Sequence, residues 1–127
     1  MIKMYYYNKC GTSRKAKKFF DEHGIPYEIV QIVEEPPTKE ELREMIKQSG
    51  VDIKKFFNTS GASYRELGMK DKIKTLNEEE LLDILASDGK MIKRPVITNG
   101  EITTVGWNDE IAETWLKLST FHKYWKK

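Results

Sequence analysis

The stretch YYYNKCGTSR, residues 5–14, decides the fold of this 127-residue chain. An apolar, β-prone run ends there and an amphipathic helical pattern begins directly after it, so the stretch predicts a strand-to-helix junction. Cys10, the single cysteine of the sequence, stands at that junction. The unpaired N–H groups and positive dipole end of a helix favour a thiolate, and Lys9 and Arg14 add positive charge on either side. The position therefore suits a nucleophilic cysteine, and the alternative is a small, buried, inert hydrophobic residue.

Length and composition limit the class of protein. Residues 1–127 are expected to form one domain. With 33% charged residues and a net charge of only +2, the chain lacks the broad basic field that direct nucleic-acid binding needs. No apolar run approaches the ~20 residues that span a bilayer, and the start of the chain has no signal-peptide layout. One cysteine permits no internal disulfide, so we expect a cytoplasmic protein, with no bound metal or cofactor.

The residues around the junction predict a β-α-β unit. Aromatic and branched residues over 2–7 indicate a strand, and residues 13–23 carry one apolar stripe of a helix. Gly24 is placed to end that helix, and residues 27–33 are typical of a second strand. A helix of this length between two strands implies that the strands are parallel.

Residues 35–90 predict a helical block without strands. A capping box at residues 38–41 begins one apolar helical face, and a second capping signature at residues 77–80 begins another. Short helices are expected at residues 52–57 and 63–67 between them.

The chain then returns to strands. Residues 95–98 and 101–105 flank Asn99-Gly100, a strong hairpin signal, and Asn108 is predicted to cap a last helix. The basic and aromatic tail, residues 121–127, is expected to be frayed or partly docked, with a contact to a partner as the alternative. The predicted order is therefore β-α-β, a helical block and β-β-α.

This order, with a cysteine at the first strand–helix junction, resembles the thioredoxin fold. The helical block between the halves resembles the ArsC/Spx family, which contains glutaredoxin-linked arsenate reductases and Spx-type regulators of RNA polymerase. The resemblance is carried by five segments that span nearly the whole chain: Cys10-Gly11-Thr12-Ser13-Arg14, Glu35-Pro36-Pro37-Thr38, Tyr64-Arg65-Glu66-Leu67-Gly68, Ile92-Lys93-Arg94-Pro95 and Gly106-Trp107. It implies an α/β, thioredoxin-like core of about residues 1–34 and 91–118, with a helical insertion of about residues 35–90.

The resemblance also implies an oxyanion site that this chain keeps only in part. The arsenate reductases of the family bind the oxyanion through the cysteine loop and three arginines. Arg94 matches one of them, whereas Asn58 and Trp107 fall at the positions of the other two. Without two guanidiniums, bidentate contacts to the anion are lost, so we expect arsenate reduction to be weak or absent. Arg65 or Lys55 are alternative sources of positive charge.

Pro95 matches the family proline that faces the cysteine and usually follows a cis peptide bond. That geometry would leave the preceding backbone free to pair with an extended substrate. From the residues alone, Arg94-Pro95 also fits a strand start with an arginine at its surface. Beside Cys10, however, the guanidinium would lower the pKa of the thiol and offer donors to an anionic substrate.

The rest of the cysteine loop, Gly11 to Arg14, is expected to support the thiolate or the substrate. For Thr12 and Ser13 two interpretations stay open, hydrogen bonding to the thiolate or capping of the helix. The thioredoxin-fold motif would place a second cysteine at position 13, so Ser13 excludes an internal disulfide and Spx-type redox switching. A monothiol can still form a mixed disulfide, which glutathione, another low-molecular-weight thiol, glutaredoxin or thioredoxin must resolve.

Three functions follow as alternatives. The first is a thiol–disulfide oxidoreductase that resembles arsenate reductases, with Cys10 and Arg94 as catalytic residues and glutathione or another thiol as reductant. The second is an Spx-like, non-DNA-binding transcriptional regulator that binds the RNA polymerase α subunit through the helical block. The third is a structural relic in which Cys10 is inert. A monomer is expected in each case.

Overall fold

A four-stranded mixed sheet lies at the centre of the computed structural model, which describes the backbone of residues 1–125 and the side chains of residues 1–119. The strands are β1 (Lys3–Tyr6), β2 (Glu28–Gln31), β3 (Val96–Thr98) and β4 (Thr103–Val105), in the order β2-β1-β3-β4. β1 pairs with β2 in parallel, whereas β3 pairs antiparallel with both β1 and β4. The predicted β-α-β and β-β-α halves of a thioredoxin-like fold are confirmed.

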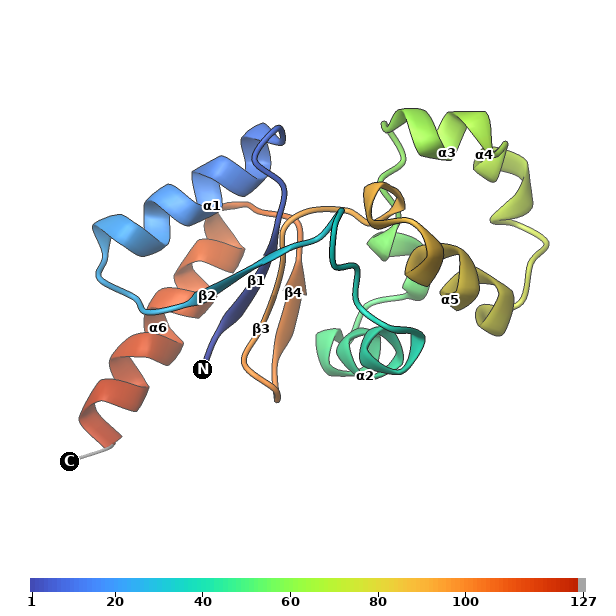
Figure 1. Cartoon of the computed structure of the whole chain (residues 1–127). Coiled ribbons are helices and arrows are strands. Elements are labelled where there is room, and N and C mark those ends of the chain that lie inside the picture. Colours follow the sequence, from blue (N-terminus) through green and yellow to red (C-terminus); the bar gives the residue numbers. More distant parts are fainter. Residues whose placement is uncertain (126–127) are drawn as a thin grey trace.

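Helices lie on both sides of the sheet (Figure 1). On one side are α1 (Gly11–Glu22) and α6 (Asp109–Trp125). The segment between β2 and β3 supplies the other side, with α2 (Lys39–Ser49), η1 (Ile53–Phe56), α3 (Ala62–Glu66), α4 (Met69–Lys72), α5 (Glu78–Ser87) and η2 (Gly89–Met91). The predicted helical character of this segment is confirmed, and α4 and η2 are elements that the sequence did not predict.

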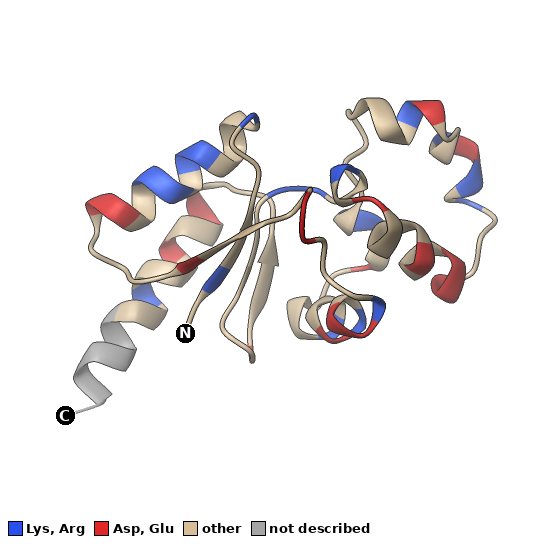
Figure 2. Ribbon diagram, viewed as in Figure 1, with Lys and Arg blue, Asp and Glu red and all other residues tan. Residues whose placement is uncertain are grey.

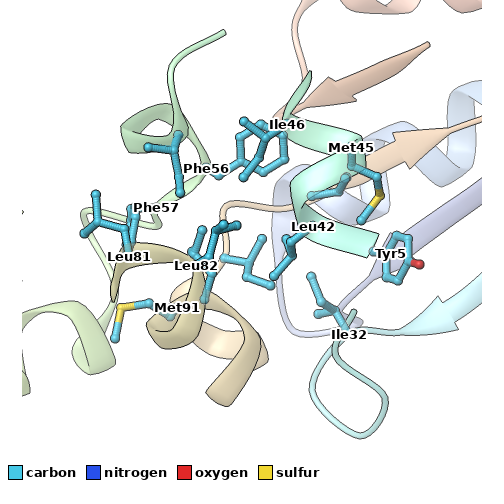
Figure 3. Close-up of a cluster of buried hydrophobic side chains, with 14 of the residues drawn as sticks. Tyr5, Ile32, Leu42, Met45, Ile46, Phe56, Phe57, Leu81, Leu82 and Met91 are labelled. Carbon is cyan, nitrogen blue, oxygen red and sulfur yellow. The ribbon is translucent and has the colours of Figure 1, made fainter. Parts of the chain in front are cut away.

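Neighbouring residues of one strand face different cores. On the side of α1 and α6, Met4 packs with Phe20 and Trp115, and all three are fully buried. Tyr5 and Val96 face the opposite side and belong to the cluster made by the helical segment. Figure 3 shows this second cluster, in which Leu42, Met45, Ile46, Phe56, Phe57, Leu81, Leu82 and Met91 gather beside Tyr5 and Ile32. Because side chains alternate along a strand, the same short strands hold both layers.

Both predicted capping boxes are present. The Thr38 hydroxyl accepts a hydrogen bond from the Glu41 N–H at 3.1 Å, and the Glu41 carboxylate accepts one from the Thr38 N–H at 2.9 Å. Asn77 and Glu80 make the same pair of bonds at the start of α5, at 2.9 and 3.0 Å. Gly50 ends α2 with a φ of 70°, in the left-handed region that favours glycine. Local sequence therefore sets the starts of α2 and α5 and the end of α2.

Two predicted boundaries were wrong. α1 begins at Gly11, earlier than predicted, because Cys10 is its N-cap residue. The hairpin loop is longer than two residues because the Asn99 side chain accepts from two later N–H groups, at 2.9 and 2.8 Å. Among the described residues only glycines have positive φ, so Asn99 does not adopt the conformation of a two-residue turn. As a result β4 begins at Thr103 rather than at residue 101.

The last helix begins as predicted. The Asn108 side chain accepts from the Ile111 N–H at 2.7 Å and so caps α6. The prediction for the tail, residues 121–127, concerns side chains outside the described residues. Across the part of the chain that the structure describes, no helix has the length and apolar character to cross a membrane.

Candidate functional site

Cys10 joins the end of β1 to the start of α1. Its backbone is extended, with φ of −100° and ψ of 118°. Its N–H donates to the Tyr7 carbonyl at 3.0 Å, and its own carbonyl accepts from the Arg14 N–H at 3.1 Å, which closes the first helical turn. The thiol makes no capping bond and is half-buried. It therefore stands, free to react, at the positive end of a 12-residue helix.

The surroundings of Cys10 lower the pKa of its thiol from the ordinary value. Partial burial opposes the thiolate and by itself would raise this pKa. The polar groups around the sulfur outweigh burial: the Ser13 N–H and hydroxyl favour the thiolate most strongly, followed by the Thr12 N–H and the Arg94 side chain. Because the N–H donors belong to the first turn of α1, the helix N-terminus is the main support of the thiolate, and Arg94 is a smaller one.

The two interpretations of Thr12 and Ser13 can now be separated. The Ser13 side chain is fully buried, and its oxygen accepts from the Tyr7 N–H at 3.4 Å while the hydroxyl also stabilises the thiolate. Among the described residues, neither hydroxyl accepts from an N–H of the helix, so the capping interpretation was wrong for both. Ser13 supports the sulfur through its side chain, and Thr12 does so through its backbone.

Arg94 is held by main-chain oxygens. Its Nη1 donates to the carbonyls of Lys90, Ile92 and Gly89 at 3.1, 3.2 and 3.5 Å. Its Cζ lies 5.0 Å from the centre of the Tyr7 ring, close to the cysteine loop. Its Nε is buried and has no hydrogen-bond partner in the described part of the chain. The guanidinium is therefore a fixed group of the site and not a loose surface arginine at a strand end.

The peptide bond between Arg94 and Pro95 is cis, as the resemblance implied. Pro95 is buried, and its carbonyl accepts from the Gly106 N–H at 2.9 Å. Within the described residues, the backbone N–H of Arg94 has no hydrogen-bond partner. Pro95 thus connects the arginine to β3 and to the loop after β4.

These residues surround a pocket of about 510 Å³. Its lining comes from three distant parts of the chain: Cys10 and Thr12; Asn58, Ser60 and Gly61; and Lys93, Arg94, Val105, Gly106, Trp107 and Asn108. No Asp or Glu of the described residues lines it, so Lys93 and Arg94 make the pocket cationic. Figure 2 shows further Lys and Arg residues along α1, the helix that follows Cys10. The described residues hold no cluster of three or more His, Cys, Asp or Glu side chains suited to a metal ion.

Asn58 and Trp107, which the resemblance predicted at the positions of two family arginines, both line this pocket. The Trp107 ring packs edge-on against Phe19, with centroids 5.5 Å apart. The Asn58 N–H donates to a carbonyl of η2 at 2.8 Å, and its amide lies so close to Gly61 that a Cβ there would stand 2.5 Å from Nδ2. At these two positions the pocket therefore presents neutral groups, an indole and an amide, and no guanidinium.

Three of the cations named from the sequence lie outside the pocket lining. The Arg14 guanidinium is exposed and donates to the Asn8 carbonyl at 2.8 Å. Arg65 donates to the Ser60 carbonyl at 2.9 Å, and Lys55 is exposed on η1. Of the predicted loop, Gly11 is exposed and Ser13 is buried, and neither is among the lining residues. Neither Arg65 nor Lys55 stands in for the missing guanidiniums.

Several lining residues were not predicted from the sequence. Lys93 stood in a quoted segment but was given no role, and its adjacency to Arg94 was the one available signal. Ser60, Gly61 and Asn108 lie in loops whose approach to Cys10 depends on the tertiary fold. No pattern in the sequence marks them as neighbours of the cysteine.

Comparison with known proteins extends over most of the chain. The model of the ArsC family matches residues 5–115. The uncharacterized protein YusI of Bacillus subtilis (strain 168) is 52% identical over 115 residues, which cover 90% of this chain and 98% of that protein. An arsenate reductase of Rhizobium meliloti (strain 1021) is 30% identical over 96 residues, 76% of this chain and 67% of that one. The global transcriptional regulator Spx 2 of Oceanobacillus iheyensis is 24% identical over 120 residues, 94% of this chain and 87% of the regulator.

Solved structures show the same fold. The crystal structure of an ArsC family related protein from Bacteroides fragilis superimposes with a TM-score of 0.87 at 41% identity, covering 90% of this chain and 96% of that one. The solution structure of SACOL0876 from Staphylococcus aureus COL gives a TM-score of 0.82 at 47% identity, covering 91% and 99%. The arrangement of the sheet and the helical segment is therefore shared along nearly the whole length.

Proposed function

Because the chain belongs to the ArsC family, we propose that it is a monothiol thiol–disulfide oxidoreductase that works in a reducing, cytoplasmic setting. One observation carries the proposal: the half-buried Cys10 thiol, whose pKa is lowered, opens into a pocket that it shares with Arg94. A thiolate is the reactive form of cysteine, and partial exposure gives a substrate access to it.

The reaction is an exchange of one disulfide for another. The Cys10 thiolate attacks one sulfur of a substrate disulfide, a new S–S bond forms, and the other sulfur leaves as a thiolate. Cys10 is oxidised as the leaving sulfur is reduced, so two electrons balance. The donors at the start of α1 and Arg94 hold the attacking thiolate in place until it reacts.

An outside thiol must complete the cycle. Cys10 is the single cysteine, and Ser13 stands where a resolving thiol would be, so the mixed disulfide cannot be expelled from within the chain. Attack by glutathione, another low-molecular-weight thiol, glutaredoxin or thioredoxin would release the substrate thiol and restore Cys10 after a second exchange. The proposal therefore includes one of these thiols as the reductant.

The test is treatment with oxidised glutathione followed by intact-mass measurement. We expect the mass to rise by one glutathionyl group, with reversal by reductant and faster reversal by glutathione with glutaredoxin. Cys10→Ser should add nothing. Ser13→Cys should first add and then lose the group, because the new thiol expels it as an internal disulfide. A wild-type protein that adds no group, or an adduct that no thiol releases, would refute the proposal.

A second candidate is supported by the similarity to Spx 2 along 94% of this chain. In that case the helical segment would bind the RNA polymerase α subunit and Cys10 would need no chemistry. A pull-down with the C-terminal domain of that subunit distinguishes the two candidates. A clear complex that survives Cys10→Ser would favour the regulator over the oxidoreductase.

A further inference from the structure

Lys93 lines the pocket, and the proposed function does not yet use it. Its side chain lies across Gly106, where a Cβ atom would stand 3.0 Å from Lys93 Cε and 3.5 Å from Nζ. Gly106 has a φ of 84°, in the region that favours glycine, so the backbone itself leaves room for the ammonium. The ion pairs among the described residues involve other cations, which leaves the charge of Lys93 available to the pocket.

Arg94 supplies a second charge next to it. Nη1 donates to carbonyl oxygens, whereas the buried Nε has no hydrogen-bond partner in the part of the chain that the structure describes. A buried donor without an acceptor is unfavourable, and a thiolate or a bound anion would satisfy it. Both cations face a lining without a described carboxylate, so the pocket attracts anions.

The shape of the pocket suits an organic molecule better than a small oxyanion. Its volume of about 510 Å³ lies within the range of roughly 300–1,000 Å³ found for organic-ligand sites. Trp107 forms one wall, and its contact with Phe19 holds the ring in place. An indole offers an apolar surface to a carbon chain but cannot replace the charge of a guanidinium.

We propose that the substrate of this site is a low-molecular-weight organic disulfide that carries a carboxylate, with Lys93 and Arg94 selecting the carboxylate and Trp107 covering the carbon chain. The inference rests on the proposed function, because Cys10 has to attack the disulfide. The Cys10 thiolate bonds to one sulfur, the substrate S–S bond breaks, and the other half leaves as a thiolate. The outside thiol already named returns Cys10 to its reduced state.

The test compares three aliphatic disulfides of similar size: 3,3′-dithiodipropionate with two carboxylates, bis(2-hydroxyethyl) disulfide without charge, and cystamine with two ammonium groups. Second-order rate constants for Cys10 are measured at low ionic strength. We expect Lys93→Gln to slow the reaction with the dianion about five- to tenfold and to speed that with cystamine. The rate with the neutral disulfide should stay within about twofold, since it reports the thiolate alone. Added salt should shrink the difference.

Two controls define the site. Lys18→Gln removes an exposed lysine of α1 outside the pocket lining and should leave all three rates unchanged. Inorganic phosphate at constant ionic strength should slow the reaction with the dianion less than propionate does. Competition by phosphate as strong as that by propionate-type anions would mark an oxyanion site and overturn the inference.

The outcomes separate this inference from the proposed function. If the three rates depend only on the pKa of the leaving thiol and Lys93→Gln changes none of them, the proposed substrate class is wrong. The proposed oxidoreductase activity is then unaffected. If Cys10 reacts with none of the three disulfides, the oxidoreductase itself is refuted, and the inference is refuted with it.

Discussion

The two sides of the pocket are built in different ways. The cysteine side comes from one strand-to-helix junction, where consecutive residues supply both the thiol and the donors that stabilise it. The opposite side collects residues 58–61, 93–94 and 105–108, which are far apart in the sequence. The first side makes the thiol reactive, and the second decides what reaches it. Reactivity is thus encoded locally, whereas selectivity depends on the tertiary fold.

Residues 58–61 and 93–94 of the opposite side are tied to the core of the helical segment. The Asn58 N–H donates to the Met91 carbonyl and the Lys93 N–H to the Phe56 carbonyl, both at 2.8 Å. Met91 and Phe56 are buried in the cluster of Figure 3. Substitutions at residues 58–61 and 93–94 can therefore change selectivity while the cysteine side keeps its geometry, whereas Trp107 packs against Phe19 of α1.

The largest expected effect is on the affinity for oxyanions, and it comes from changes on the side of the pocket opposite the cysteine. In Asn58→Arg with Trp107→Arg, two guanidiniums return to positions that line the pocket. A charge-assisted hydrogen bond contributes about 1.5–3 kcal/mol, so two should raise the affinity for arsenate or phosphate about a hundredfold or more. Isothermal titration with phosphate measures this gain, and an assay coupled to glutathione and glutaredoxin measures arsenate reduction.

The wild type provides the reference for that experiment. We expect weak or absent arsenate reduction from it, because Arg94 is the sole arginine among the described lining residues. Wild-type turnover equal to that of a three-arginine relative would contradict this account of oxyanion binding. An unchanged affinity in the double variant would show that the pocket wall does not govern selectivity.

The next effect concerns Arg94, which links the two sides. Arg94→Ala should raise the pKa of Cys10 and slow its alkylation by iodoacetamide about threefold at neutral pH, because one donor to the thiolate is lost. Arg14→Ala is the matched control, since its guanidinium is exposed and bonds to the Asn8 carbonyl. Equal effects of the two substitutions on the pH midpoint of alkylation would mean that general positive charge, and not the placement of Arg94, stabilises the thiolate.

Most of the fold was predictable because its signals are local. Both capping boxes, the glycine that ends α2 and the cap of α6 by Asn108 were all read from short runs of sequence. The hairpin boundary was missed because Asn99 bonds through its side chain instead of adopting a positive φ. An asparagine in a turn can either bond to later N–H groups through its side chain or adopt a positive φ, and sequence alone does not decide between the two.

The site was predictable on one side only. Cys10, its loop and the lowered pKa follow from a helix N-terminus, which local periodicity reveals. Asn58 and Trp107 were reached through family resemblance, because nothing near them in the sequence points to a cysteine. Lys93 was passed over since its role depends on Gly106, a residue that only the folded chain brings beneath it.

A comparable effect distinguishes the hydroxyls of Ser13 and Thr12 in the cysteine loop. Ser13→Ala removes a hydroxyl that stabilises the thiolate, so the pKa of Cys10 should rise and alkylation should slow about threefold at neutral pH. Thr12→Ala is the control, because Thr12 acts through its backbone N–H, which the substitution keeps. The measurement is the pH dependence of alkylation. Identical midpoints for the two variants would show that the Ser13 hydroxyl does not reach the sulfur.

The smallest effect is on the free energy of unfolding. It tests whether the folded chain stabilises the Cys10 thiolate better than the unfolded chain does. Because folding lowers the pKa of Cys10, the unfolded chain binds more protons than the folded one between the two pKa values. The contribution of the thiolate is therefore complete above the ordinary thiol pKa of about 8.5, and it is lost as pH falls through the folded pKa.

Denaturant unfolding of wild type and Cys10→Ser, under reductant and over a series of pH values, measures this contribution. The difference in the free energy of unfolding should grow in favour of the wild type as pH rises through that window, and other titrating groups cancel in the difference. Partial exposure of the thiol keeps the slope shallow, since solvent screens its interactions. A difference that does not change with pH would mean that the helix N-terminus stabilises the thiolate no better than water does. The claim that the local structure makes Cys10 reactive would then be wrong.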